Sequence, residues 1–162
     1  MIILGIDPGY AIVGWGVIDY TANRFTVIDY GAVTTDAKIP FNRRLEMIYD
    51  DVGEIITRYR PSAMAIEKLF YNTNAKTVID VAQARGVINL AAVKNRVEIF
   101  EYTPLQVKQS VVGYGRAEKK QVQEMTRVIL KLPAIPKPDD TADALAMAIC
   151  HAHASGSLIN RL

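Results

Sequence analysis

Four carboxylates in this sequence occupy positions that suit metal-dependent chemistry. Asp7 ends the apolar run IILGID, and Glu67 ends a second apolar run, SAMAIE. Asp140 and Asp143 are three residues apart, so on a helix both can face the same point. If the two runs are neighbouring parallel strands, their ends bring Asp7 and Glu67 together, and a helix packed on the sheet can add the two aspartates. Converging carboxylates repel one another, and hard divalent cations such as Mg²⁺ or Mn²⁺ relieve that repulsion. Two such ions support phosphodiester cleavage, which is the chemistry this pattern predicts.

Three of the four acids also have a structural interpretation. Asp7 precedes Pro8 and Gly9 and can accept hydrogen bonds from the amides of that turn. Asp140 and Asp143 suit the N-terminus of a helix, where the helix dipole favours negative charge. No other catalytic constellation competes, because one cysteine and two histidines at 150–153 provide neither a nucleophilic site nor the spacing of a zinc site. The two interpretations differ in whether the acids converge.

Strands and helices can be placed from hydrophobic periodicity and from turn residues. The predicted strands span residues 2–7, 11–19, 24–33, 62–67 and 97–102. The predicted helices span residues 41–60, 75–94, 103–112, 117–131 and 139–154. Three successive strands with short connections imply an antiparallel meander, and the later strands alternate with helices. The sequence therefore predicts one α/β domain over residues 1–162, a mixed sheet flanked by helices, with a flexible tail at 155–162.

Composition excludes several classes of protein. The chain has 162 residues, of which 50% are hydrophobic and 22% are charged, and this suits a globular domain rather than a disordered chain. The formal net charge is only +2, but residues 108–138 include seven basic residues against two acidic ones. That excess favours an anionic partner, with a solvated helix face as the alternative. No apolar run approaches the roughly 20 residues of a membrane span, and the N-terminal run lacks a basic leader. We expect a cytoplasmic protein without membrane contact.

Small residues mark two places where close packing is expected. Gly14 and Gly16 flank Trp15 in a predicted strand, where the absence of a side chain lets another backbone or a ligand approach. The helix at 75–94 is rich in alanine and includes Gly86. Such a helix surface packs closely against a neighbour. That neighbour is either the sheet of the same domain or a second copy of the chain.

The same residues carry a resemblance to a known family. Five blocks occur in order: GIDPG with WGVI at 5–18, AIEKLF at 65–70, QARGV at 83–87, VKQSVVGYGRAEKKQV at 107–122 and DDTADALAMAICHAH at 139–153. They cover nearly the whole chain, and their order and spacing are far more specific than any one block. The chain resembles the RuvC family of Holliday junction resolvases, nucleases with a ribonuclease H-like fold. The resemblance implies a five-stranded mixed sheet, three antiparallel strands followed by two parallel ones, flanked by helices.

The resemblance also implies an activity and its partners. Members of the family are homodimers that bind four-way DNA junctions and nick two opposing strands symmetrically, leaving 5′-phosphate and 3′-hydroxyl ends that a ligase can seal. The implied role is in homologous recombination and DNA repair, together with the branch-migration proteins RuvA and RuvB. The implied cofactor is Mg²⁺, two ions per active site, with Mn²⁺ as a substitute.

The catalytic and metal-binding residues implied by the resemblance are four acids. They are Asp7, Glu67, Asp140 and Asp143. The doubled aspartate raises a question of register, and the D-x-x-D spacing of the family selects Asp140. Asp139 is then expected to be the N-cap of the last helix.

The implied DNA-binding residues are Phe70, Lys108, Arg116 and Lys119. Phe70 matches an aromatic residue that stacks on bases at the junction centre, which is plausible chemistry for an aromatic side chain in a loop. A phenylalanine folded onto the core is its alternative. Lys108 and Lys119 match basic residues near the scissile phosphate. A solvated lysine is the alternative for both and the preferred interpretation of Lys120.

Two other functions remain as hypotheses. One alternative is another ribonuclease H-like nuclease of the RNA-processing type. The other is a junction-binding module whose acids are structural. Residues 103–131, with their K-Q and G-x-G-x-A-x-K pattern, argue against the RNA-processing type. The binding module predicts that junctions bind equally well without metal and are never cut. Sugar kinases and actin-like ATPases share a strand-ending aspartate, but those folds need two such domains.

Overall fold

The computed structural model describes residues 1–69 and 75–159, so Phe70 lies outside the described residues. The strands are β1 (Ile2–Asp7), β2 (Ile12–Thr21), β3 (Arg24–Thr34), β4 (Ala63–Glu67) and β5 (Glu98–Tyr102). The helices are α1 (Phe41–Tyr59), α2 (Ala75–Lys94), α3 (Pro104–Val112), α4 (Lys119–Ile129) and α5 (Asp139–Ile159). None of these described helices combines the length and the apolar character that a membrane span requires.

One sheet with the order β3-β2-β1-β4-β5 forms the centre of the molecule. The pairs β1–β2 and β2–β3 are antiparallel, whereas β1–β4 and β4–β5 are parallel. This confirms the predicted five-stranded mixed sheet. The parallel pairs place the last residues of β1 and β4 at the same edge of the sheet.

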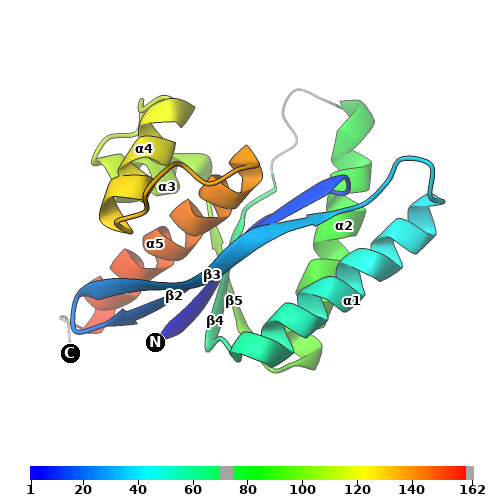
Figure 1. Cartoon of the computed structure of the whole chain (residues 1–162), viewed down its shortest axis with the longest axis horizontal. Helices are drawn as coiled ribbons and strands as arrows, with labels where there is room; N and C mark the ends of the chain where they lie inside the picture. Colours follow the sequence, from blue (N-terminus) through cyan, green and yellow to red (C-terminus); the bar gives the residue numbers. More distant parts are fainter. Residues whose placement is uncertain (70–74, 160–162) are drawn as a thin grey trace.

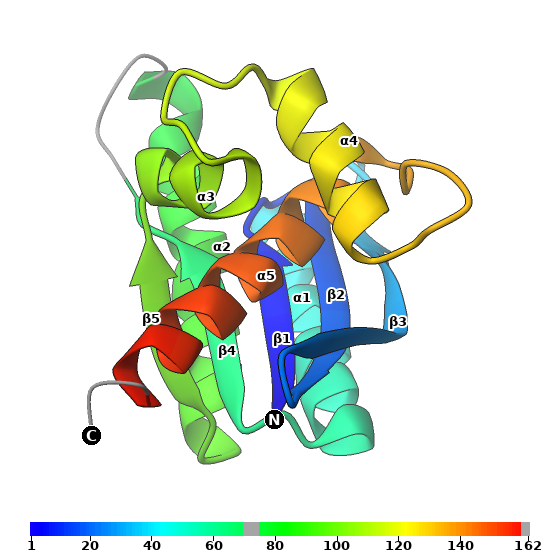
Figure 2. The same cartoon turned by 90° about the vertical axis from the view of Figure 1, so that its left-hand side faces the viewer.

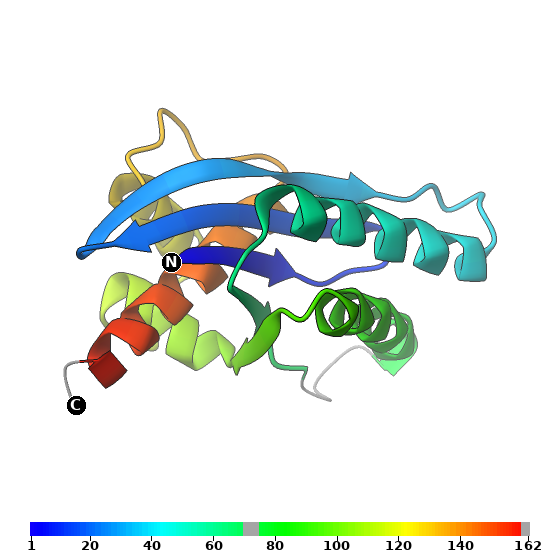
Figure 3. The same cartoon turned by 90° about the horizontal axis from the view of Figure 1, so that it is seen from below.

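Helices cover both faces of the sheet, as Figure 1 shows, with α3, α4 and α5 on one face and α1 and α2 on the other. Seen from below, α1 and α2 lie side by side (Figure 3). Ile3 and Leu4 are both fully buried, but they belong to different hydrophobic cores. Successive residues of a strand point to opposite faces, so a strand with helices on both faces is apolar throughout. Along β1, Ile3, Gly5 and Asp7 therefore face α5.

Helix α5 lies directly on the sheet, where it crosses β1 and β2 (Figure 2). A β-carbon built on Gly14 would lie 1.9 Å from the carbonyl oxygen of Asp140, and one on Gly5 would lie 1.9 Å from that of Ala144. Both glycines are therefore required by the approach of the α5 backbone. The expectation that another backbone comes close to the glycines of β2 is confirmed for Gly14, whereas a β-carbon on Gly16 would collide with the side chain of Leu145.

The bounds of two helices, α4 and α5, differ by more than one residue from the sequence-based expectation, and α4 ends at Ile129 rather than at residue 131. Helix α4 begins at Lys119 rather than at residue 117, because Glu118 is its N-cap and donates its backbone N–H to Oε1 of Gln121 at 2.8 Å. Helix α5 continues to Ile159, so residues 155–159 of the expected flexible tail are helical, and residues 160–162 lie outside the described part. The start of α3 is as expected, because the Thr103 hydroxyl accepts a hydrogen bond from the backbone N–H of Gln106.

Replacing Gly14 by valine is expected to destabilise the fold by about 3 kcal/mol, because the new side chain collides with the backbone of α5. Chemical denaturation with far-ultraviolet circular dichroism measures this. Gly53 is the matched control, since a β-carbon there meets nothing within 4 Å and the residue lies inside α1. Gly53→Ala should stabilise the protein by about 0.5–1 kcal/mol. A Gly14→Val variant as stable as the wild type would show that α5 does not need this approach.

Candidate active site

The first two acids come together through the register of β1 and β4. The last paired residues of these parallel strands are Ile6 and Ile66, and Asp7 and Glu67 are the next residue of each strand. Asp7 lies on the face covered by α5, and Glu67 follows Ala65, whose side chain packs in the same core as α5. Both carboxylates therefore leave the same edge of the sheet on the same face.

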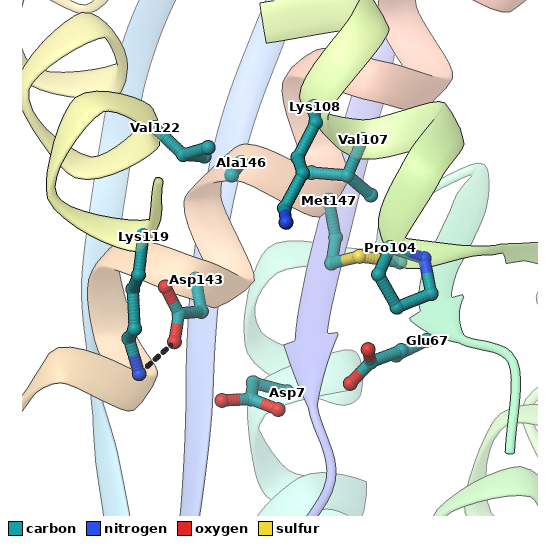
Figure 4. A pocket seen from close by; sticks show the side chains of 10 residues that line it. All are labelled: Asp7, Glu67, Pro104, Val107, Lys108, Lys119, Val122, Asp143, Ala146 and Met147. Carbon is teal, nitrogen blue, oxygen red and sulfur yellow. Dashed lines mark ion pairs between the residues drawn. The ribbon is translucent and has the colours of Figure 1, made fainter. Parts of the chain in front are cut away.

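The first turn of α5 brings the aspartates to that edge. Gly14 is the residue paired with Asp7 across β1 and β2, and the backbone of Asp140 rests on Gly14. Asp143 lies one turn further along α5, and in Figure 4 its carboxylate is on the side of Asp7 that faces away from Glu67. One pocket contains three of the four predicted acids, and its lining residues are Asp7, Glu67, Pro104, Val107, Lys108, Lys119, Val122, Asp143, Ala146 and Met147.

Asp7 is the most perturbed carboxyl group of the site. Burial, followed by the negative charges of Asp143, Glu67 and Asp140, raises the pKa of Asp7 from 3.8 to about 8. Its side chain makes no hydrogen bond or ion pair with any other described residue. Desolvation and the charge of Asp143 also raise the pKa of Glu67, against the opposing effect of Lys119. An unpaired, buried carboxylate among other carboxylates is costly unless a cation joins it, and this is the pattern of a functional site.

Helix α4 provides the counter-charge of the site. The Nζ atom of Lys119 lies 2.8 Å from Oδ2 of Asp143, and Nε2 of Gln123 donates to Oδ1 of the same carboxylate at 3.5 Å. Lys119 and Gln123 are one turn apart on α4, so they share one face of that helix. The hydrogen bond from Lys119 to Asp143 raises the pKa of the lysine, which keeps it protonated.

The four acids suit a hard divalent cation in the kind of donor that they offer, because all of their ligating atoms are carboxylate oxygens. In the part of the chain that the structure describes, however, these acids are not arranged as a cluster of metal ligands. No group of three His, Cys, Asp or Glu side chains among residues 1–69 and 75–159 lies close enough to hold a metal ion. The contact of Asp143 with Lys119 and Gln123 provides a physical reason, because both of its oxygens are engaged with α4.

The doubled aspartate is divided between two roles. Asp140 acts on the pKa of Asp7, whereas Asp139 does not contribute to it. The carboxylate of Asp139 instead accepts a hydrogen bond from Nζ of Lys137 at 2.6 Å. The expectation that Asp139 is the N-cap is wrong, since α5 already begins at this residue. Asp140 is partly buried but does not line the pocket, so it approaches the other acids less closely than Asp143 does.

The predicted DNA-binding residues have different places. Lys108 on α3 and Lys119 on α4 both line the pocket, as Figure 4 shows. Arg116 is exposed in the connection between these helices and does not line the pocket. Within the basic stretch 108–138, Arg127 and Lys137 are bound to Glu124 and Asp139. The lysines at the pocket are thus better placed for a phosphate than most of that stretch.

Several residues of the site have no signal in the sequence that singles them out. Pro104, Val107 and Met147 form an apolar wall beside the acids. Gln123 is 6% exposed, and its position four residues after Lys119 is the one pattern that connects it to the site. His151 lies away from the acids, as expected, with its Nδ1 atom 2.7 Å from the hydroxyl of Tyr102.

Known proteins are similar to this chain in both sequence and fold. The family described as Crossover junction endodeoxyribonuclease RuvC matches residues 3–151. A protein of that name from Ruminiclostridium cellulolyticum is 59% identical over 161 residues, which are 98% of this chain and 97% of that relative. The structure of Thermus thermophilus RuvC superposes with a TM-score of 0.90 at 35% identity, covering 97% of this chain and 96% of that one. The same protein in complex with Holliday junction substrate gives a TM-score of 0.89 at 32% identity, with the same coverage.

The family match covers the strand ends, the α3–α4 segment and the start of α5, which are the elements that build the pocket. The relatives match over nearly their whole length, so the likeness is not confined to one motif. Sequence and overall fold agree, and the chain, with its ribonuclease H-like fold, belongs to the RuvC family of crossover junction endodeoxyribonucleases.

Proposed function

We propose that this protein is a structure-selective endodeoxyribonuclease that resolves four-way DNA junctions in homologous recombination and repair. The observation that carries the proposal is the pocket in which Asp7, Glu67 and Asp143 meet Lys108 and Lys119. An anionic substrate such as DNA is repelled by these acids, and the two lysines reduce that repulsion. Support comes from the Thermus relative, which forms a complex with Holliday junction substrate.

The acids Asp7, Glu67, Asp140 and Asp143 would together hold two Mg²⁺ ions. When bound, the ions supply an activated water and neutralise charge on the phosphate that is cut, leaving a 5′-phosphate and a 3′-hydroxyl. Lys108 and Lys119, which line the same pocket, would bind the phosphate backbone beside the acids. The apolar wall of Val107 and Met147 limits the water that reaches the acids from the side of α3.

A second copy of the chain would provide the second active site for a symmetric pair of nicks. Helix α2 has an outer face that includes Ile79, Leu90 and Val93, which are 64%, 51% and 61% exposed. Gly86 lies on the same side of the helix, and a β-carbon there would meet nothing within 4 Å. An exposed apolar stripe with a glycine at its centre suits close packing of two helices. We propose a homodimer formed through α2, acting on junction DNA in the cytoplasm with the branch-migration proteins RuvA and RuvB.

Replacing Asp7 by asparagine is expected to abolish cutting while leaving junction binding largely intact. The amide keeps the shape of the side chain but removes the charge that a divalent cation needs. Incubation of a labelled four-way junction with Mg²⁺, followed by a denaturing gel, should show paired symmetric nicks for the wild type and intact strands for the variant. Asp50→Asn, at an exposed position of α1, is the control and should cut as the wild type does.

Two results would contradict the assignment. Cutting that survives Asp7→Asn would remove Asp7 from the reaction. A wild-type protein that binds junctions equally with and without Mg²⁺, and never cuts them, would instead be the non-catalytic binding module.

The raised pKa of Asp7 predicts how stability depends on pH in the absence of metal. The folded protein keeps the Asp7 proton up to a pKa of about 8, whereas an unfolded chain releases it near 3.8. The stability contributed by this protonation is complete below 3.8 and is lost as the pH rises toward 8. Asp7→Asn carries no such charge and should therefore be more stable than the wild type at pH 8, by about 2 kcal/mol or a Tm shift of about 4–8 °C.

Thermal unfolding in a chelating buffer from pH 4 to pH 9 measures this difference. The two Tm values should converge near pH 4 and separate as the pH rises. Addition of Mg²⁺ should raise the Tm of the wild type at pH 8 and leave that of Asp7→Asn nearly unchanged. Parallel Tm curves over the whole range would show that Asp7 is not buried among repelling charges.

The dimer surface can be tested with two substitutions on the outer face of α2. Ile79→Asp combined with Val93→Asp places charges on the apolar stripe, so the protein should become monomeric while its Tm changes little, because both side chains are exposed in the monomer. Multi-angle light scattering during size-exclusion chromatography gives the mass. Val128→Asp on α4, at a residue that is 50% exposed, is the control and should remain dimeric. A dimer that survives the double substitution would place the interface elsewhere.

A further inference from the structure

The structure points to a competition at the active site that goes beyond the proposed chemistry. We infer that Lys119 and the divalent cation compete for Asp143, so that binding of the cation releases Lys119 to contact a DNA phosphate. This inference rests on the proposed function, because it takes Asp143 to be a metal ligand. Its first step, the release of Lys119 by the cation, takes place without DNA.

The contacts of Asp143 show a carboxylate held by α4. Lys119 takes one oxygen at 2.8 Å, and Gln123 approaches the other at 3.5 Å. In Figure 4 the Asp143 carboxylate points to Lys119, on the opposite side of the pocket from Glu67. A metal ion shared with Asp7 and Glu67 has to draw at least one oxygen of Asp143 away from α4. The ion pair and the metal ligation therefore use the same atoms.

The two partners of Asp143 differ in their freedom to move. Gln123 is 6% exposed and fixed in the packing between α4 and α5. The side chain of Lys119 is 61% exposed, so it can leave Asp143 without opening the core. Its long, flexible stem allows the ammonium group to relocate at the opening of the pocket. Lys119 is thus the partner that a cation can displace.

The charges of the pocket provide the driving force. Among the residues that the structure describes, Lys119 forms an ion pair with Asp143, and its charge opposes the effects that raise the pKa of Asp7 and Glu67. A divalent cation among these carboxylates supplies more positive charge at shorter distance and repels the ammonium group. The released lysine then lies beside a site that binds phosphodiester DNA. Its next available anion is a phosphate.

The α4–α5 contact does not depend on this ion pair. Buried apolar residues such as Val122 and Leu130 of the α4 region join the same core as α5. An ion pair with a lysine as exposed as Lys119 contributes little to the stability of the fold. Loss of Lys119 should therefore alter cation affinity far more clearly than it alters the fold. By linkage, whatever strengthens cation binding by freeing Lys119 also strengthens DNA binding through the freed lysine.

The experiment measures cation binding to the full-length protein without DNA. Mn²⁺ affinity is obtained by electron paramagnetic resonance for the wild type, Lys119→Gln and Lys120→Gln. Lys119→Gln should bind Mn²⁺ about 5-fold more tightly, because no lysine competes for Asp143. Lys120 is the matched control, since it is the adjacent exposed lysine on α4, and its replacement should change the affinity less than about 2-fold.

A second measurement follows Lys119 itself in the wild type. Trace acetylation with acetic anhydride, quantified by mass spectrometry, reports how readily each lysine reacts. Saturating Mg²⁺ should increase the labelling of Lys119 relative to Lys120 at least 2-fold, because the ion pair with Asp143 is broken. Unchanged or decreased relative labelling would mean that the pair persists in the metal-bound protein, which overturns the inference.

The outcomes separate this inference from the proposed function. If the wild type binds Mn²⁺ and nicks junctions but Lys119→Gln binds Mn²⁺ no more tightly, the competition is refuted and the nuclease assignment remains. If the wild type binds no Mn²⁺, the metal site and the competition are both refuted. If Lys120→Gln tightens binding as much as Lys119→Gln, the effect is general electrostatics, and the competition is again refuted.

Discussion

The direct contact between the backbone of α5 and the glycines of β1 and β2 is the constraint on which the site depends. Gly5 and Gly14 leave no side chain between the sheet and the helix, so carbonyl groups of α5 rest on the strands. Most helices pack on a sheet through side chains, which hold the two backbones well apart. Here the backbone of the first turn of α5 packs directly on β2 at Gly14, the residue paired with Asp7. The aspartates of that turn can then act on a carboxylate of the sheet.

This proximity creates an electrostatic problem that the fold solves only in part. Asp7 is buried, makes no hydrogen bond or ion pair with another described residue, and is surrounded by three further acids, so it keeps its proton to about pH 8. Lys119 neutralises Asp143 rather than Asp7. The protein without metal therefore stores an unfavourable arrangement that a divalent cation improves. Preference for the cation arises from the poor solvation of these carboxylates as much as from their number.

Much of the fold could be predicted from the sequence because its signals are local. The apolar runs of β1 and β4, the periodicity of α1 and the capping pair at Thr103 all correspond to elements of the structure. The boundaries that differ, at the start of α4 and the end of α5, depend on capping and on packing against distant strands. Those interactions have no local signature, so periodicity alone misplaces such ends.

The candidate site was less accessible to sequence reasoning than the fold. Asp7 and Glu67 could be paired from the strand pattern, and the spacing of Asp140 and Asp143 indicated a shared helix face. The order of closeness could not be predicted: Asp143 lines the pocket with Asp7, whereas Asp140 does not. The hydrogen bond from Gln123 to Asp143 could not be predicted from the sequence either. It joins α4 to α5, and the relative position of these helices is set by their hydrophobic packing.

The alternation of side chains along β1 finally explains why a nuclease site can be built at the end of so apolar a strand. Leu4 and Ile6 face the core beneath α1 and α2, and Ile3 and Asp7 face α5. A shift of one residue in the register between β1 and β4 would turn the carboxylate toward the opposite core, where no cation or solvent could reach it. The apolar residues on both sides of β1 oppose that shift, since each would have to exchange one core for the other. The hydrophobic pattern that defines the strand thus also fixes the face from which Asp7 emerges.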